Sequence, residues 1–233
     1  MSAYLLLNIL IILFPLVLSF EKKISFYKKF FPLLISIVIT GIIFIVWDSV
    51  AVTRNDWSFN GEFVSAIKIF NLPPEEILFF VTVPYSIIFT FVSIRYYVKE
   101  KIIFIPSALI YFVSLVLIIS AVTFSGKYYT FTVSLFSGIL ISFLNYFYRD
   151  FIMSYIFIVT LFISYIPFLI VNYILTSLPV VVYNPSAITG LRFLTIPAED
   201  FLYSFSMITM WIFIFQIFEK YFIKRHNNDL SKT

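Results

Sequence analysis

Residue types that commonly build catalytic and metal sites are scarce in this chain. Its 233 residues include no cysteine, one histidine and five glycines. Without cysteine the protein can form no disulfide, thiolate metal site, iron–sulfur cluster or cysteine nucleophile. The histidine, His226, lies in a charged tail, so a histidine-built metal site is excluded too. The glycines are too widely spaced for a dinucleotide fingerprint or a phosphate loop. An enzyme of this composition would depend on carboxylates and aromatic side chains.

Charged residues are also few. They make up 12% of the chain, whereas hydrophobic residues make up 61% and the mean hydropathy is +1.02. A soluble domain carries about 25% charged residues to solvate its surface. The composition therefore excludes a water-soluble domain and indicates a protein that lies in lipid.

Seven apolar runs predict seven membrane-spanning helices, since a bilayer core requires about 20 residues per helix. Read between charges and prolines, they are residues 3–20, 30–47, 75–94, 102–122, 131–148, 151–175 and 200–218. The first has no basic segment before Tyr4 and no small-residue cleavage pattern near Phe20, so we interpret it as a span and not as a signal peptide. We expect an all-α, polytopic, single-domain membrane protein with a solvated tail at 219–233.

Lysine and arginine are unevenly distributed between the connections. Those on one side of the predicted bundle hold twelve, and those on the other side hold four. Cytoplasmic loops carry the excess of positive charge. The pattern predicts a cytoplasmic C-terminus and an external N-terminus in the cell membrane. It also accounts for the net charge of +4, which therefore gives no indication of nucleic-acid binding.

An internal repeat is visible in the two longest external connections and the helices that follow them. The segment PPEEILF at 73–79 resembles PAEDFLY at 197–203, and WDSVAVT at 47–53 resembles YNPSAIT at 183–189. The first pair is 124 residues apart and the second 136, which predicts about twelve extra residues around 55–68 in the first copy. We expect two parallel three-helix repeats, at about 3–94 and 131–218, joined by a linker helix at about 102–122. Parallel membrane repeats typically share a site at their interface.

These features resemble the integral-membrane lycopene beta-cyclases of the carotenoid pathway, which occur as two heterodimerising subunits or as one fused chain. The resemblance rests on the two Pro-x-Glu-[Glu/Asp] motifs followed by an aromatic, on the Trp/Tyr-Asp/Asn element before each, and on the size and span pattern. This chain is similar to the fused form. Its second copy departs from the first, with Asp200 for Glu76, Tyr183 for Trp47 and Asn184 for Asp48, so the two halves need not be equivalent.

The resemblance implies a redox-neutral ring closure in lycopene, of the intramolecular lyase or isomerase class. An acid protonates the terminal double bond, the neighbouring double bond attacks the tertiary cation, and loss of a proton leaves a beta-ionone ring. No metal or nicotinamide is needed for that balance, and no cofactor is expected. The expected partners are the lipophilic polyene and the bilayer, and other carotenoid enzymes could associate with the protein.

The candidate catalytic residues are the four motif acids, Glu75, Glu76, Glu199 and Asp200. A structural reading competes with catalysis, because proline and acidic residues are favoured in the first turn of any helix. Adjacent helical residues point about 100° apart, so we expect one acid of each pair to face the pocket and its neighbour to act as a cap or partner. Glu75 and Glu199 are preferred as the shared element because they are identical in both copies.

The residues near the motifs are candidates for substrate binding. Aromatic faces can attract a carbocation, although Trp and Tyr at a membrane edge also act as interfacial anchors. Arg54 or Arg192 could pair with a motif carboxylate, and Pro167 is expected to kink its helix. The candidate substrate-binding residues are Trp47, Asp48, Trp57, Phe79, Tyr183, Asn184, Arg192 and Tyr203.

Three other functions compete with cyclisation. A small-molecule transporter with parallel three-helix repeats is the main alternative, although no Pro-Gln pair of the SWEET type occurs. A rhodopsin needs a lysine in its last span, and none lies between Lys127 and Lys220. A prenyltransferase needs spaced aspartate clusters for magnesium, whereas the motif acids are adjacent pairs. The sequence leaves open the ring isomer, whether one or both ends react, which acid donates the proton, the oligomeric state and any flavin or nicotinamide dependence.

Overall fold

The fold is built almost entirely from long helices. The computed structural model describes residues 2–230, with side chains for 2–225; His226 and the end of the predicted tail lie outside the part whose side chains are described. The long helices are α1 (Ala3–Leu18), α2 (Phe30–Thr53), α3 (Pro74–Tyr97), α4 (Ser107–Thr123), α5 (Tyr128–Phe147), α7 (Tyr155–Ser177) and α8 (Ala198–Leu230). The short elements are η1 (Phe26–Lys29), α6 (Arg149–Ile152), β1 (Trp57–Phe59), β2 (Val181–Tyr183), β3 (Arg192–Phe193) and β4 (Ile196–Pro197). The all-α class expected from the sequence is confirmed.

Five of these helices are long and apolar enough to cross a membrane: α2, α3, α5, α7 and α8. The helices α1 and α4 are apolar but shorter, with 16 and 17 residues. The expected start of the fourth helix at residue 102 is wrong. Ile102 pairs with Ser154 and the Ile103 amide donates to the Met153 carbonyl, so this segment is extended. In addition, Pro106 disfavours the helical conformation at the residue before it, Ile105.

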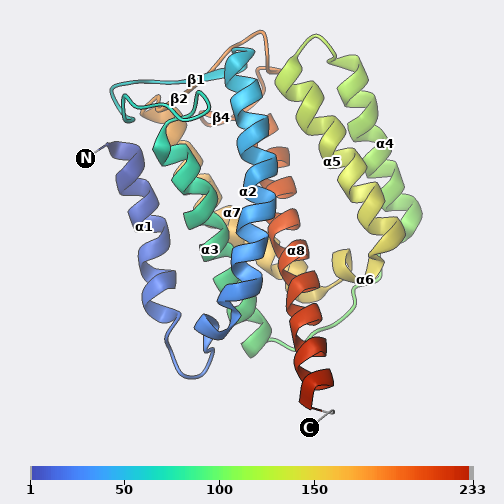
Figure 1. Ribbon diagram of the computed structural model, residues 1–233. Helices are drawn as coiled ribbons and strands as arrows, with labels where there is room; N and C mark the ends of the chain where they lie inside the picture. Colours follow the sequence, from blue (N-terminus) through green and yellow to red (C-terminus); the bar gives the residue numbers. More distant parts are fainter. Residues whose placement is uncertain (1, 231–233) are drawn as a thin grey trace.

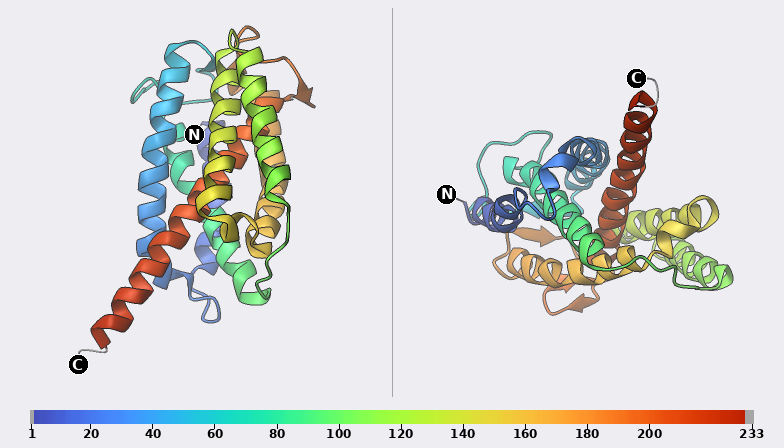
Figure 2. Two further views of the ribbon diagram at one scale, coloured as in Figure 1. Left: turned by 90° about the vertical axis from the view of Figure 1, so that its right-hand side faces the viewer. Right: turned by 90° about the horizontal axis from the view of Figure 1, so that it is seen from below.

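The helices form an elongated bundle in which α2, α3 and α8 are central (Figure 1). Helix α1 packs on α3, while α2 and α3 each pack on α8. Helix α7 contacts both α3 and α8, and α4 packs mainly on α5 at one side (Figures 1 and 2). Residues far apart in sequence therefore meet along the middle of the molecule.

Small polar side chains join neighbouring helices. The Ser36 hydroxyl donates to the Trp211 carbonyl at 2.7 Å, and Ser114 donates to the Gly138 carbonyl at 2.6 Å. In lipid, helices associate through close packing and such hydrogen bonds, because lipid tails are as apolar as the helix surfaces. Gly138 also allows α4 and α5 to approach closely, since an added Cβ would lie 3.1 Å from the Ser114 carbonyl oxygen.

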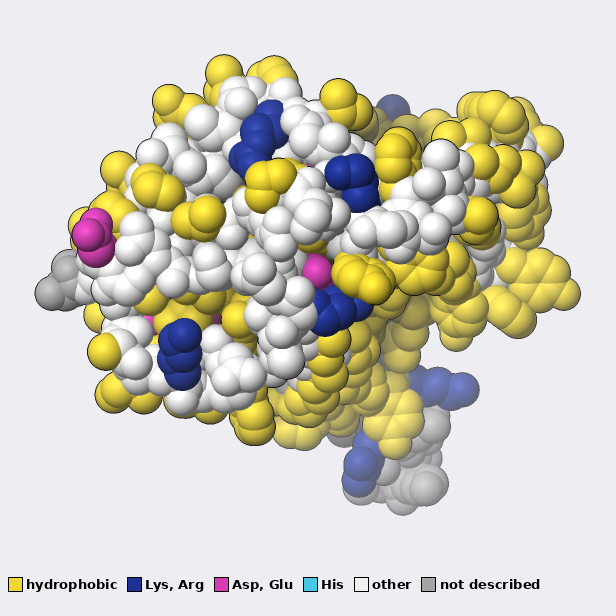
Figure 3. Space-filling view, turned by 90° about the horizontal axis from the view of Figure 1, so that it is seen from above, with side chains coloured by type: hydrophobic (Ala, Val, Ile, Leu, Met, Phe, Trp, Pro, Cys, Tyr) yellow, Lys and Arg dark blue, Asp and Glu magenta, His cyan; other side chains and the backbone are white. Residues whose placement is uncertain are grey.

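At one end of the bundle, which we call the strand end, the α2–α3 and α7–α8 connections lie together (top of Figure 1). Strands β1 and β2 pair antiparallel there, with Trp57 opposite Tyr183. The hairpin of β3 and β4 leads into α8. Seen face-on, the strand end shows mostly backbone and uncharged side chains, with scattered basic groups and few acidic ones (Figure 3).

The opposite end, which we call the basic end, contains a buried ion cluster. The Arg95 guanidinium donates to both carboxylate oxygens of Glu219, at 2.6 and 2.7 Å, and Lys29 pairs with the same carboxylate. Glu219 is only 6% exposed. The expectation of a solvated tail from residue 219 is therefore wrong at its start, because α8 continues and Glu219 ties it to α3 and to the start of α2.

Candidate active site

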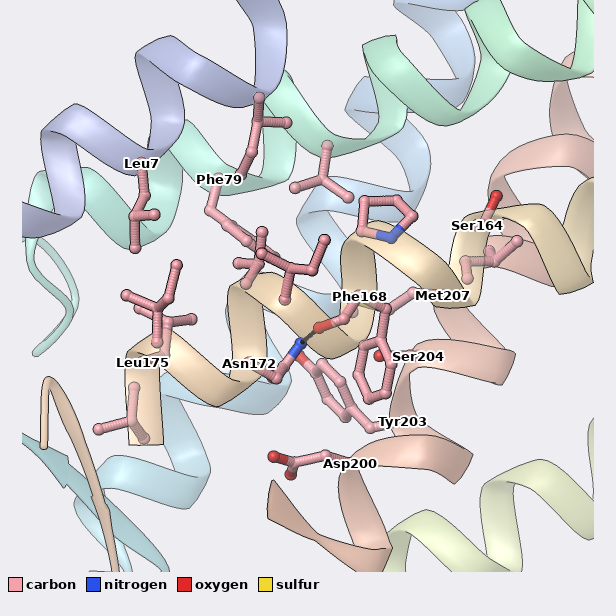
Figure 4. A pocket seen from close by; sticks show the side chains of 18 of the residues that line it. Leu7, Phe79, Ser164, Phe168, Asn172, Leu175, Asp200, Tyr203, Ser204 and Met207 are labelled. Carbon is pink, nitrogen blue, oxygen red and sulfur yellow. Dashed lines mark hydrogen bonds between the residues drawn. The ribbon is translucent and has the colours of Figure 1, made fainter. Parts of the chain in front are cut away.

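A cavity of about 490 Å³ lies between α1, α3, α7 and α8 and reaches the strands at the strand end (Figure 4). Most of its wall is apolar. Leu7 and Leu175 lie toward the strand end, whereas Phe168 and Met207 lie deeper in the bundle. The space suits a hydrocarbon ligand better than a polar one.

Three carboxyl groups line this otherwise apolar cavity: Asp48 from the end of α2, Glu76 from the start of α3 and Asp200 from the start of α8. All three residues are buried, with exposed fractions of 2% for Asp48, 8% for Glu76 and 1% for Asp200. No other charged residue lines the cavity among the described residues. Burying an acidic side chain in a membrane protein costs free energy of desolvation, so three buried acids at one cavity indicate a functional site.

Tyrosine hydroxyls hold each of these acids. Tyr4 donates to Glu76 at 2.6 Å, and Tyr203 donates to Asp48 at 2.6 Å. Asp200 accepts from Tyr129 at 2.8 Å and from Tyr183 at 2.9 and 3.0 Å.

The two tyrosines on Asp200 remain hydrogen-bond donors. Burial and the charge of Asp200 raise the pKa of the Tyr183 hydroxyl above its usual range. Two charge-assisted hydrogen bonds of this kind favour the ionised carboxylate. When Asp200 is ionised, its carboxylate is therefore held by two hydroxyl donors.

Asp48 and Glu76 both line the cavity and lie close enough for their carboxyl groups to interact. Ionised carboxylates only accept hydrogen bonds, so two carboxyl groups can bond only when one carries a proton. The pair can therefore hold a proton at the wall of the cavity.

The first acid of each motif does not line the cavity. Oε1 of Glu75 accepts from the Ser65 amide at 2.9 Å and from the Ser65 and Ser2 hydroxyls at 2.6 Å. Oε1 of Glu199 accepts from the Thr189 amide at 2.7 Å and from the Thr189 and Thr130 hydroxyls at 2.7 and 2.6 Å.

These bonds fasten each connection to the helix that follows it. The structure thus places one acid of each pair at the cavity and the other in a structural contact. The acids at the cavity are Glu76 and Asp200, and not Glu75 and Glu199, which the sequence favoured as the shared element. The reason is that a polar residue ten positions earlier, Ser65 or Thr189, binds the first acid.

The other sequence candidates fall into two groups. Trp57, Phe79, Tyr183 and Tyr203 line the cavity beside the acids. Trp47 lies instead in a separate groove between α2 and α5.

Two polar candidates, Asn184 and Arg192, do not line the cavity. Asn184 joins the α7–α8 connection to the α2–α3 connection by donating to the Asn55 carbonyl at 3.0 Å. Arg192 donates to the Thr195 carbonyl and lies 5.9 Å from the centre of the Tyr183 ring. Arg54 pairs with Asp56 and not with a motif carboxylate. Burial raises the pKa of Asp56 above its usual value, and Arg54 opposes that rise.

Sequence reasoning missed three polar residues of the site, Tyr4, Tyr129 and Asn172. All three line the cavity. Tyr4 and Tyr129 each begin the first helix of one half, and Asn172 lies 124 residues after Asp48, the interval that separates Glu75 from Glu199. Applying that single interval to the whole chain would have identified Asn172.

No group of three or more His, Cys, Asp or Glu side chains suited to a metal ion occurs among the described residues. The cavity itself presents three buried carboxyl groups, four tyrosine hydroxyls and aromatic side chains.

Comparison with known proteins gives one match. The family model described as lycopene cyclase matches residues 1–94 and 126–218. The unmatched segment between them contains α4. No curated protein and no solved structure matches the chain.

Proposed function

Because the chain belongs to the lycopene cyclase family and is therefore a membrane enzyme of carotenoid cyclisation, we propose that the cavity between α1, α3, α7 and α8 binds the reacting end of lycopene. The observation that carries this proposal is the placement of three buried carboxyl groups at one end of an apolar cavity. A hydrocarbon substrate fits the wall, and its cyclisation requires only the movement of a proton. Neither the family match nor the described residues favour the transporter alternative.

The Asp48–Glu76 pair is proposed as the proton donor. It holds a proton between two carboxyl groups, and the Tyr4 and Tyr203 hydroxyls fix both partners in position. Protonation of the terminal double bond makes a new C–H bond and leaves a tertiary cation. The donor pair becomes fully ionised, so its negative charge faces the cation that it has created.

Asp200 is proposed as the group that stabilises the cation and accepts the final proton. The neighbouring double bond attacks the tertiary cation, which closes the ring and moves the positive charge to a ring carbon. Faces of Trp57, Phe79 and Tyr203 line the same region and can stabilise that charge. Proton loss then restores a double bond, so the reaction is an isomerisation that needs no oxidant or reductant.

The strand end is proposed to face the outside and the basic end the cytoplasm. The connections at the basic end carry the excess of lysine and arginine, as the positive-inside rule requires. All seven long helices are proposed to cross the bilayer. Helix α1 is about 24 Å long at 1.5 Å per residue, somewhat less than a hydrocarbon core of about 30 Å, which local thinning can accommodate.

Two parallel repeats related by one interval of 124 residues are proposed in place of the two intervals expected from the motifs. The interval relates β1 to β2, the end of α2 at Thr53 to the end of α7 at Ser177, and Ser65 to Thr189. Asp48 then corresponds to Asn172, not to Asn184. No insertion around 55–68 is needed, and the second half carries an amide where the first carries an acid.

The three cavity acids can be tested by carboxamide substitution in a lycopene-accumulating bacterium. We expect Asp48→Asn, Glu76→Gln and Asp200→Asn each to lower ring formation by about 100-fold or more, because a positioned acid or base typically contributes 10²–10⁴. The matched control is Glu62→Gln, since Glu62 is exposed in the α2–α3 connection. Pigments are measured by chromatography against the amount of folded protein in the membrane. Full cyclisation by Asp48→Asn and Glu76→Gln would refute the assignment of the donor.

A further inference from the structure

The cavity has a side opening between α1 and α7. Leu10 on α1 and Ile163 and Ile170 on α7 line the cavity, yet 58%, 40% and 58% of these residues is exposed. A residue that is both cavity-lining and exposed marks a mouth. Helix α1 packs mainly on α3 and shares a side-chain cluster with α7 at Tyr4, Leu7 and Leu175, so the opening lies beyond that cluster, at Leu10, Ile163 and Ile170. Figure 4 shows α1 and α3 on one side of the cavity and α7 and α8 on the other.

This mouth is apolar and faces the surface that lipid would cover. Pro15, Leu10, Ile163 and Ile170 line this part of the cavity, whereas the three carboxyl groups belong to the helix ends at the strand end. A hydrocarbon dissolved in the bilayer loses no hydration on entering such a mouth, whereas a polar solute would leave its hydrogen bonds behind. The opening therefore suits a ligand that arrives from within the membrane.

We propose that lycopene enters, and the cyclised product leaves, sideways through this slot between α1 and α7, so that the unreacted part of the polyene stays in the slot and the adjacent lipid. This inference rests on the proposed function of the cavity. An end of the chain reaches the acids while the remainder of the molecule needs no space inside the protein. Both ends can then react in succession, by release and re-entry of the other end.

The corresponding place in the other half is closed. Applying the 124-residue interval, Ile170, Val171 and Ile174 on α7 correspond to Val46, Trp47 and Val50 on α2, and these line the groove between α2 and α5.

Trp47 takes the place of Val171 in that groove. Its ring centre lies 5.2 Å from that of Phe136 and 5.5 Å from that of Tyr203, so it blocks the path from the groove to Asp48. Of these two related positions, only the α1–α7 slot communicates with the carboxyl groups. Trp47, which the sequence suggested as a substrate-binding residue, is instead proposed to close the groove between α2 and α5.

The test compares side-chain size at the slot with size just outside it. Ile170 and Ile166 lie one turn apart on α7 and are 58% and 62% exposed, but only Ile170 lines the cavity. On α1, Leu10 and Leu13 are 58% and 53% exposed, and only Leu10 lines the cavity. Each position is changed to Ala and to Trp, and initial rates of lycopene consumption at low lycopene are measured per folded protein in reconstituted membranes.

We expect Ile170→Trp and Leu10→Trp to be at least ten-fold slower than Ile170→Ala and Leu10→Ala. At Ile166 and Leu13 the Trp and Ala variants should agree within about two-fold. Equal rates of the Trp and Ala variants at both slot positions would overturn the proposal. Glu76→Gln, measured in parallel, separates the two ideas: an active Glu76→Gln refutes the cavity chemistry, whereas an inactive Glu76→Gln with unblocked Trp variants refutes only the slot.

Discussion

Substitution of the two adjacent acids Glu75 and Glu76 should have different effects: Glu75→Gln should lower stability, whereas Glu76→Gln should lower turnover. In Glu75→Gln the three hydrogen bonds that Oε1 accepts from Ser2 and Ser65 lose their charge. Bonds to charged groups contribute about 1.5–3 kcal/mol and neutral ones about 0.5–1.5, so the loss is roughly 1 kcal/mol per bond. Oε2 has no hydrogen-bond partner among the described residues, so an amide placed there adds an unsatisfied buried donor, which costs about 1–3 kcal/mol. Together with the three weakened bonds, we expect a total loss of about 4–6 kcal/mol in the free energy of unfolding.

The assay is thermal unfolding of the purified protein together with pigment formation per folded molecule. At roughly 2–4 °C per kcal/mol for a chain of this size, the midpoint should fall by about 8–24 °C. Turnover of the folded fraction should stay near that of the unsubstituted enzyme, whereas Glu76→Gln should lose turnover and keep its midpoint more closely. A Glu75→Gln protein with an unchanged midpoint and no turnover would refute the division of roles.

Three further changes test the frame around the site. Glu219→Gln should lower the free energy of unfolding by about 2 kcal/mol, because Arg95 loses its charged partner. The loss is limited because about a third of the Arg95 side chain is exposed to solvent, and a melting curve measures it. Gly138→Ala should lower it by about 1–3 kcal/mol through overpacking of α4 on α5, measured in the same way. Arg54→Ala removes the cation that opposes the raised pKa of Asp56. An acid whose folded pKa is raised loses stability as pH rises from its unfolded pKa through its folded pKa, so this variant should be weakened more at pH 7 than at pH 4.

The sequence predicts the helices better than it predicts which side chains meet. Long apolar runs between charges and prolines identify every long helix, and Pro74 with two following acids marks the start of α3. Which of Glu75 and Glu76 faces the cavity could not be predicted from the sequence. It depends on the hydrogen bonds from Ser65 to Glu75, and Ser65 lies in a connection without helix or strand periodicity.

Two other errors have similar physical causes. Tyr4 and Tyr129 could not be separated from the other aromatic residues, since a lipid-facing tyrosine and a carboxylate-binding one look alike in sequence. The likeness between WDSVAVT and YNPSAIT favoured Asn184 as the counterpart of Asp48, whereas the proposed interval of 124 residues gives Asn172, because short similar strings outweighed the constant spacing of whole elements.

The pairing of β1 with β2 has a consequence for how the active protein could be made. The proposed donor pair, Asp48 and Glu76, lies before α4 in the chain, and Asp200 lies after it. The pairing of β1 with β2 and the contact between α2 and α8 hold the two portions together. If the chain were divided within residues 95–125, the stretch between the two segments that the family model matches, the two separately synthesised polypeptides would have complementary surfaces. Neither polypeptide would own a complete set of acids, so ring closure would begin only when the two had met in the membrane.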